Sequence, residues 1–120
     1  MPPQRIRLSR ARGWRKPAGA VVVSRPSKWG NPYTVVEDRG GYIVRDADRI
    51  QYGRYGDVWA ARARAVELYQ QRVIDTWRPD RRQQVRAALR GRDLACWCPL
   101  DHPCHGDALI AFANTPARRN

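Results

Sequence analysis

The chain of 120 residues has few acidic residues, very little lysine and no long apolar run. Asp and Glu number 11 against 23 Lys and Arg, and the only lysines are Lys16 and Lys28. The net charge of +12 favours polyanionic partners such as DNA, RNA or nucleotides, although a solvated arginine-rich surface would give the same charge. No apolar stretch reaches the roughly 20 residues that a membrane span needs, so we expect no membrane partner.

Cysteine is also scarce, and the three that occur, Cys96, Cys98 and Cys104, lie close together. No apolar segment follows the basic residues of the first ten positions, so no secretory signal is visible. We therefore expect reduced thiols and a cytoplasmic location rather than a disulfide framework. Clustering of this kind indicates a site and not scattered core thiols.

The hydrophobic fraction of 42% and the five tryptophans predict a folded domain. We divide the chain into a basic N-terminal arm (1–19), a single α/β domain (20–114) and a short tail (115–120). The expected elements are strands at 20–24 and 93–98, a β-hairpin over 33–44, a loop over 45–56, and helices over 58–77, 81–89 and 104–114. Strands that alternate with helices predict a small α/β domain with a mostly parallel sheet.

The first expected helix carries apolar residues at helical spacing, and Asp57 is its expected N-cap. The face that we expect it to bury consists of Trp59, Ala63, Val66, Tyr69, Val73 and Trp77. On this pattern both tryptophans of the helix are core residues.

The segment CWCPLDHPCHGD, which begins at Cys96, carries the candidate chemistry. Alternation along a strand places Cys96 and Cys98 on one side. Cys104 and His105 open the following helix, where unpaired backbone N–H groups lower a thiol pKa and attract anions. Asp107 falls in the first turn, where the helix dipole favours an acid.

Three interpretations of this segment stay open. A zinc site would use the four ligands Cys96, Cys98, Cys104 and His105, whose types fit although the C-x-C and adjacent Cys-His spacing is unusual. Without metal, Cys104, His105 and Asp107 would form a catalytic set beside a bound anion or nucleotide. The third interpretation is structural, with the thiols buried as small hydrophobes and His105 acting as a cap.

A second motif, SKWGNP, follows the first expected strand. If the first and last strands are parallel neighbours, the loops after them emerge at the same sheet edge. The expected ligand-binding residues there are Arg25, Ser27, Lys28, Trp29 and Asn31. In a binding site Lys28 would pair with phosphate, Trp29 would stack on a base and Asn31 would hydrogen-bond a polar base edge. In a purely structural role Lys28 would be a solvated cation, Trp29 a core side chain and Asn31 part of a turn.

Together, RPSKWGNPY (25–33), LRGRDLACWCP (89–99) and PCHGD (103–107) resemble a small domain family of actinobacteria and their phages that is known only as a domain of unknown function. The resemblance covers residues 12–114. More distantly, the C-terminal motif is similar to a Rossmann-like family in which Cys-His-Arg opens a helix, but Gly106 stands here in place of the arginine. The resemblance implies an α/β fold and no established activity.

We therefore predict a small Rossmann-like three-layer α/β domain with a mostly parallel sheet, a β-hairpin and a basic N-terminal arm. It is expected to bind a nucleotide or nucleic acid at a Cys/His site on a helix N-terminus, and to act on nucleotides or bases if it is an enzyme. The alternative is a non-enzymatic basic module, stabilised by zinc, that docks DNA, RNA or a host protein.

Overall fold

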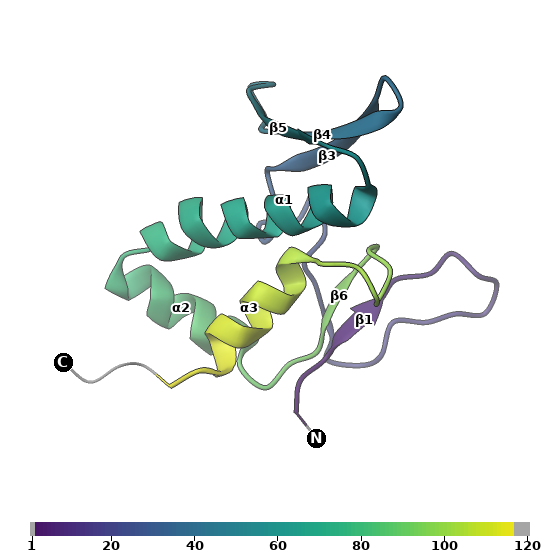
Figure 1. Cartoon of the computed structure of the whole chain (residues 1–120). Coiled ribbons are helices and arrows are strands. Elements are labelled where there is room, and N and C mark those ends of the chain that lie inside the picture. Colours follow the sequence, from purple (N-terminus) through teal and green to yellow (C-terminus); the bar gives the residue numbers. More distant parts are fainter. Residues whose placement is uncertain (1, 117–120) are drawn as a thin grey trace.

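The computed structural model describes residues 2–116 as a mixed α/β arrangement (Figure 1). Its elements are β1 (Arg5–Arg7), β2 (Val21–Val22), β3 (Thr34–Asp38), β4 (Gly41–Arg45), β5 (Gln51–Tyr55), α1 (Val58–Arg72), a 3-10 turn (Ile74–Thr76), α2 (Pro79–Leu89), β6 (Leu94–Cys96) and α3 (His105–Asn114). The α/β class and the three expected helices are confirmed, although the first helix ends at Arg72 and the 3-10 turn follows it. No helix of this described part is both long enough and apolar enough to cross a bilayer.

A parallel sheet of three short strands positions the cysteine motif. Its strand order is β1-β6-β2, so that β6 is the central strand. Leu94 of β6 pairs with Arg5 of β1 on one side and with Val21 of β2 on the other. All three residues of β6 are buried, as a central strand covered on both faces requires. β2 and β6 are therefore parallel neighbours, and the segments that follow them leave at the same edge of the sheet.

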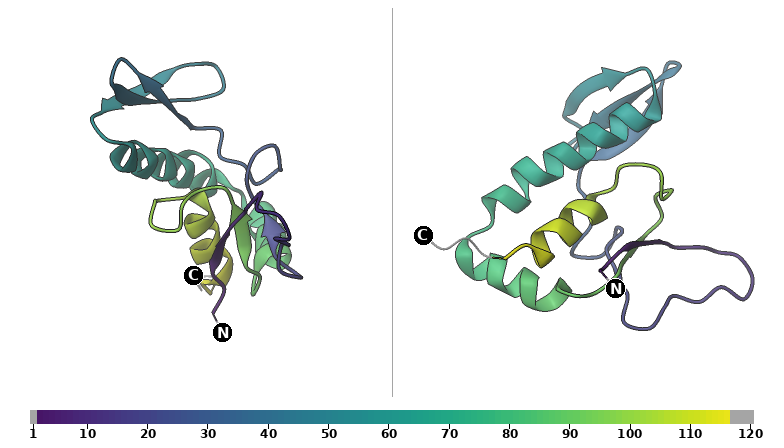
Figure 2. Two further views of the ribbon diagram at one scale, coloured as in Figure 1. Left: turned by 90° about the vertical axis from the view of Figure 1, so that its right-hand side faces the viewer. Right: turned by 60° about the horizontal axis from the view of Figure 1, so that its bottom comes forward.

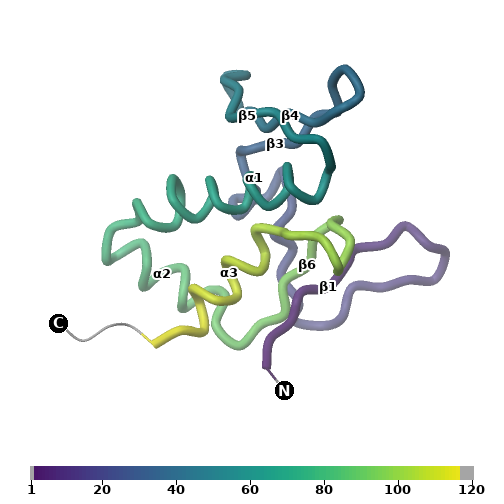
Figure 3. Tube along the Cα trace, in the orientation of Figure 1, coloured from purple at the N-terminus to yellow at the C-terminus, as the bar shows by residue number. Residues whose placement is uncertain are grey.

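The strand β1 comes from the segment that we expected to be a basic arm. Arg5–Arg7 pairs with β6 and so belongs to the folded domain. Only Ile6 in this short strand is apolar, and an edge strand of three residues leaves no periodic pattern. The chain between β1 and β2 then leaves the body as a long loop (Figure 3).

The expected hairpin is confirmed as β3 and β4, with Asp38 opposite Gly41. Arg39 and Gly40 between them both have positive φ, 52° and 79°, as a two-residue hairpin turn requires. The prediction of a loop over 45–56 is wrong, because β5 pairs antiparallel with β4 in that range. Its two half-buried tyrosines pack on the hydrophobic cluster under α1, which stabilises a strand of otherwise polar composition.

The helix α1 begins at its expected cap, since the Asp57 carboxylate accepts a hydrogen bond from the backbone N–H of Ala60 at 2.8 Å. The buried face differs from the expected one and consists of Ala61, Ala65, Leu68 and Tyr69. Trp59, expected in the core, is 53% exposed. The reason is that α1 has partners on two sides: it contacts β3, β4 and β5 as well as α3, and it lies between them (Figure 2).

Two hydrophobic clusters follow from this arrangement. The larger one lies between the parallel sheet and the helices and includes Trp29, Tyr69, Leu94, Cys104 and Leu109. The smaller one lies between α1 and the antiparallel sheet and is built around Val44 and Leu68. The antiparallel strands thus form a separate sheet and do not extend the parallel one.

Candidate functional site

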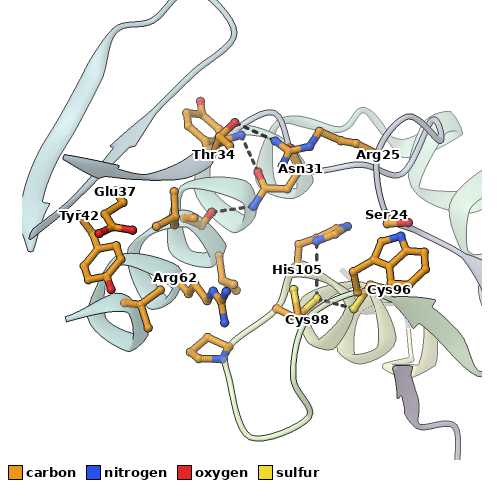
Figure 4. Close-up of a pocket in the computed structure, with 18 residues that line it drawn as sticks. Ser24, Arg25, Asn31, Thr34, Glu37, Tyr42, Arg62, Cys96, Cys98 and His105 are labelled. Carbon is orange, nitrogen blue, oxygen red and sulfur yellow. Dashed lines mark hydrogen bonds between the residues drawn. The ribbon is translucent and has the colours of Figure 1, made fainter. Parts of the chain in front are cut away.

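The two sequence motifs line one cavity of about 410 Å³ (Figure 4). From the first motif and the chain before it come Ser24, Arg25 and Asn31, and from the second come Cys96, Trp97, Cys98, Pro103, Cys104 and His105. The opposite wall belongs to β3, β4 and α1. The cavity lies where β2 and β6 end, which is where a parallel sheet places its ligand sites.

Asn31 and Arg25 hold the first motif in shape. The Asn31 side chain is buried, with Nδ2 donating to the carbonyl of Ala65 at 3.1 Å and Oδ1 accepting from the backbone N–H of Tyr33 at 2.9 Å. Nη1 of Arg25 donates to the carbonyl of Asn31 at 3.0 Å and to Oγ1 of Thr34 at 2.8 Å. The asparagine amide is therefore engaged within the protein, whereas the guanidinium borders the cavity.

The other three predicted ligand-binding residues do not line the cavity. Trp29 is 5% exposed and packs in the larger cluster, where the Tyr69 hydroxyl donates to its carbonyl at 3.0 Å. Lys28 is exposed, and its Nζ lies 5.0 Å from the centre of the Trp29 ring. Oγ of Ser27 accepts a hydrogen bond from the backbone N–H of Trp29. The stacking role expected for Trp29 is not available to a side chain that is buried in the core.

Three reduced thiols meet at the end of β6. The Sγ atoms of Cys96, Cys98 and Cys104 all lie within 4.8 Å of one another, and those of Cys96 and Cys104 are 3.0 Å apart. Cys104 is also the N-cap of α3, because its Sγ accepts from the backbone N–H of Gly106 at 3.4 Å. The three sulfurs could hold a metal ion. His105, the fourth predicted ligand, is not part of this group.

Arg5 is buried beneath these thiols, and its side chain is only 6% exposed. Nη1 lies 3.8 Å from Sγ of Cys96, and Nε donates to the Asp107 carboxylate at 3.0 Å. The remaining hydrogen bonds run to four carbonyl oxygens of the loop after β6, those of Cys98 (3.3 Å), Pro99 (3.2 Å), Leu100 (3.0 Å) and His102 (2.7 Å). Asp107, predicted as catalytic, does not line the cavity and instead anchors this arginine.

The pKa values of the Cys96 and Cys104 thiols shift in opposite directions. Hydrogen bonds from Cys104 and Cys98, together with Arg5, lower the pKa of Cys96 and favour its thiolate form. The hydrogen bonds to Cys96 and Cys98, together with burial, raise the pKa of Cys104. We had expected the helix N-terminus to lower the pKa of Cys104, but its contact with the backbone N–H of Gly106 is outweighed by the neighbouring sulfurs.

The His105 side chain is buried, which favours its neutral form. Its Nε2 donates to the carbonyl of Val23 at 2.7 Å, and this leaves Nδ1, 3.8 Å from Sγ of Cys104, as the acceptor. Burial lowers the pKa of His105, even though the hydrogen bond to Val23 opposes the shift. Cys104 and His105 therefore form a thiol–imidazole pair in the cavity wall, as the sequence predicted.

Sequence reasoning missed the contribution of the opposite wall. Arg62 of α1 lies across the cavity from His105 (Figure 4), and its Nη1 contacts Nδ1 of His102. Glu37 and Tyr42, from β3 and β4, complete this side. In a chain with 23 basic residues, no local pattern distinguishes Arg5 or Arg62 from the others.

A family model described as Domain of unknown function (DUF4326) matches residues 6–115. The chain belongs to the DUF4326 family. The matched range covers both motifs and every cavity residue of this DUF4326 domain, and it begins one residue after Arg5. No curated protein and no solved structure matches the chain.

Proposed function

We propose that the cavity binds a nucleotide or a nucleic-acid end. The observation that carries the proposal is the meeting of both motifs around one cavity of about 410 Å³, within the range of roughly 300–1,000 Å³ common for small-molecule sites. Its place at the carboxyl ends of β2 and β6 also supports a Rossmann-like interpretation of the parallel sheet.

The charges of the cavity favour an anion. The buried Arg5 compensates the negative charge of a Cys96 thiolate. Arg25 and Arg62 line the cavity from two directions, against the carboxylate of Glu37. Each guanidinium is held through Nη1 and carries further N–H groups that can donate to phosphate. Trp97, which lines the same cavity and is 43% exposed, takes over the base-stacking role that we had assigned to Trp29.

The thiols supply the chemistry if the bound nucleotide is modified. The lowered pKa of Cys96 and its contact with Nη1 of Arg5 favour this residue as the nucleophile, in place of the Cys104 that the sequence suggested. Cys104 and His105 together offer a protonated thiol and a neutral imidazole for acid–base work.

Binding of AMP, GMP, CMP and UMP, measured by isothermal titration calorimetry, tests the proposal. At least one should bind, and Arg62→Gln should weaken it roughly 10- to 100-fold, as expected for loss of one charged hydrogen bond. Arg39→Gln, in the β3–β4 turn, removes the same charge away from the cavity and should have little effect. Absence of binding at millimolar nucleotide, or equal affinities for the two variants, would reject the cavity as a nucleotide site.

The thiol cluster supports a second candidate, the zinc-stabilised module. Cys96, Cys98 and Cys104 would be ligands, with Nδ1 of His105 as the fourth donor. The hydrogen bond from Nε2 of His105 to Val23 is the kind of contact that orients metal-bound histidines.

Elemental analysis of protein purified without chelator tests this candidate. One zinc per chain, a melting temperature that falls on chelation, and loss of the metal in Cys98→Ser would support it. Metal-free protein that neither binds added zinc nor changes its melting temperature would reject the zinc site and leave the nucleotide proposal standing.

A further inference from the structure

A second concave surface lies away from the cavity, between α2 and α3. This groove encloses about 1180 Å³ and shares no lining residue with the cavity. Arg82 and Arg86 line it from α2, Arg90 from the cap that directly follows this helix, and Trp77 and Phe112 are the aromatic residues of its wall. The three arginines stand four residues apart and therefore follow one stripe of the helix.

This stripe carries uncompensated positive charge. Within residues 2–116 the ion pairs are Arg5–Asp107, Arg54–Asp38 and Arg64–Glu67, and none of them involves the groove. Like charges four residues apart on a helix repel one another and destabilise it. An anionic partner would remove that repulsion.

The wall of the groove holds two of the arginines, Arg82 and Arg86, in place. The Arg86 guanidinium lies over the Phe112 ring at 4.3 Å, and its buried Nε has no hydrogen-bond partner in the described part of the chain. Nε of Arg82 donates to the carbonyl of Trp77 at 2.8 Å. Phe112 and Trp77 contact edge to face, with ring centres 5.3 Å apart. An ordered set of guanidiniums loses less entropy on binding phosphate than freely moving side chains do.

We propose that this groove binds the sugar-phosphate backbone of a nucleic acid. A rise of about 1.5 Å per helical residue spreads the three arginines over about 12 Å, so that each guanidinium can contact a different phosphate of one strand. The net charge of +12 adds long-range attraction for the same partner. The proposal concerns a different surface from the cavity and does not depend on nucleotide binding there.

The experiment compares two full-length variants of equal charge. R82Q/R86Q/R90Q changes the groove, and R12Q/R39Q/R49Q removes three exposed arginines from loops and turns, so that each carries +9 in place of +12. Fluorescence anisotropy measures binding to a single-stranded oligothymidylate and to a mixed-sequence duplex over a range of salt concentrations. The two nucleic acids show which form of the backbone the groove prefers.

The salt dependence gives the decisive readout. Loss of three phosphate contacts should lower the slope of log K against log salt by about 2 on the single strand or about 2.7 on the duplex. The control variant should keep the wild-type slope and bind at least about tenfold more tightly than the groove variant at intermediate salt. R82K/R86K/R90K should retain the slope, because it retains the charges.

Three results would overturn the proposal. They are equal weakening in the two charge-matched variants, no binding by the wild type at low salt, and binding of polyglutamate as tight as that of the oligonucleotide, which would assign the groove to an acidic protein. Because Arg82 also supports the turn before α2, melting curves are recorded, and R86Q/R90Q provides a milder variant with an expected slope change of about 1.4 on the single strand. Unchanged AMP binding in the groove variant would show that the two surfaces act independently.

Discussion

Nη1 of Arg5 lies 3.8 Å from Sγ of Cys96, although the two residues are 91 positions apart in the chain. The contact joins an edge strand to the thiol cluster, and the same guanidinium holds the loop that carries the chain from β6 to α3. Burial alone would lower the pKa of Arg5, but its contacts with Cys96, Cys104 and Asp107 raise it. The arginine is therefore both a structural centre of the loop and the counterion of the thiolate.

Arg5→Gln should destabilise the domain by about 3 kcal/mol, because it leaves several carbonyls of the loop without their charged donor. In chelator-treated protein the thiolate absorbance at neutral pH should also fall. Arg7→Gln, an exposed change on the same strand, is the control and should alter neither quantity. An Arg5→Gln variant with unchanged thiolate absorbance would show that Cys96 does not need this counterion.

Gly30→Ala should destabilise the first motif. A Cβ at this position would lie 2.6 Å from Cγ of Arg25 and 3.1 and 3.2 Å from its Cα and N, so the backbone must move. We expect a loss of roughly 1–3 kcal/mol in urea unfolding, and weaker ligand binding through displacement of Arg25. Gly56→Ala meets nothing within 4 Å and should be neutral or slightly stabilising. Equal stabilities for the two variants would contradict the close approach of Gly30 to Arg25.

Two tryptophans should respond very differently to truncation. Trp29→Ala removes a side chain that is 5% exposed and should cost about 3–5 kcal/mol. Trp59→Ala removes one that is 53% exposed and donates a single hydrogen bond to the Asp101 carbonyl, so the expected cost is about 1 kcal/mol. Denaturant unfolding of both variants checks the order, and a larger loss for Trp59→Ala would reverse the assignment of core and surface.

Tyr69 should make the domain sensitive to alkaline pH. Burial raises its pKa to about 12, against about 10 in the unfolded chain. Between these values the unfolded state loses its phenol proton first, so stability should fall as the pH rises above about 10. In Tyr69→Phe this part of the pH dependence should disappear, while the lost hydrogen bond to Trp29 costs about 1 kcal/mol at neutral pH. Melting curves across this pH range test both effects, and an equally steep alkaline loss in the variant would assign it to another group.

The sequence by itself determined the parts that depend on local patterns. The Asp57 cap and helical periodicity gave α1, and the apolar residues within 81–89 gave most of α2, which begins two residues earlier at Pro79. A turn of Asp, Arg and two glycines gave the hairpin, and β-branched and apolar runs gave β2 and β6. The joining of the two motifs also followed from local information, since parallel neighbours place the loops that follow them at one edge. These features depend on neighbouring residues and on general rules of sheet geometry.

Only the tertiary structure decided which side chains are buried and which of them contact one another at the site. Packing of α1 between a sheet and a helix selected a different buried face, so that Trp59 is exposed and Trp29 fills the core. Pairing of β1 with β6 brought Arg5 to Cys96, and the contacts of Cys96 with Cys104, Cys98 and Arg5 lower the pKa of Cys96. The strand β1 is short and is stabilised by pairing with the distant β6, and the polar β5 depends on packing of its tyrosines on the cluster that includes Val44 and Leu68. The physical reason is common to all these cases: burial, pairing and pKa depend on contacts between residues far apart in the chain, which no local pattern records.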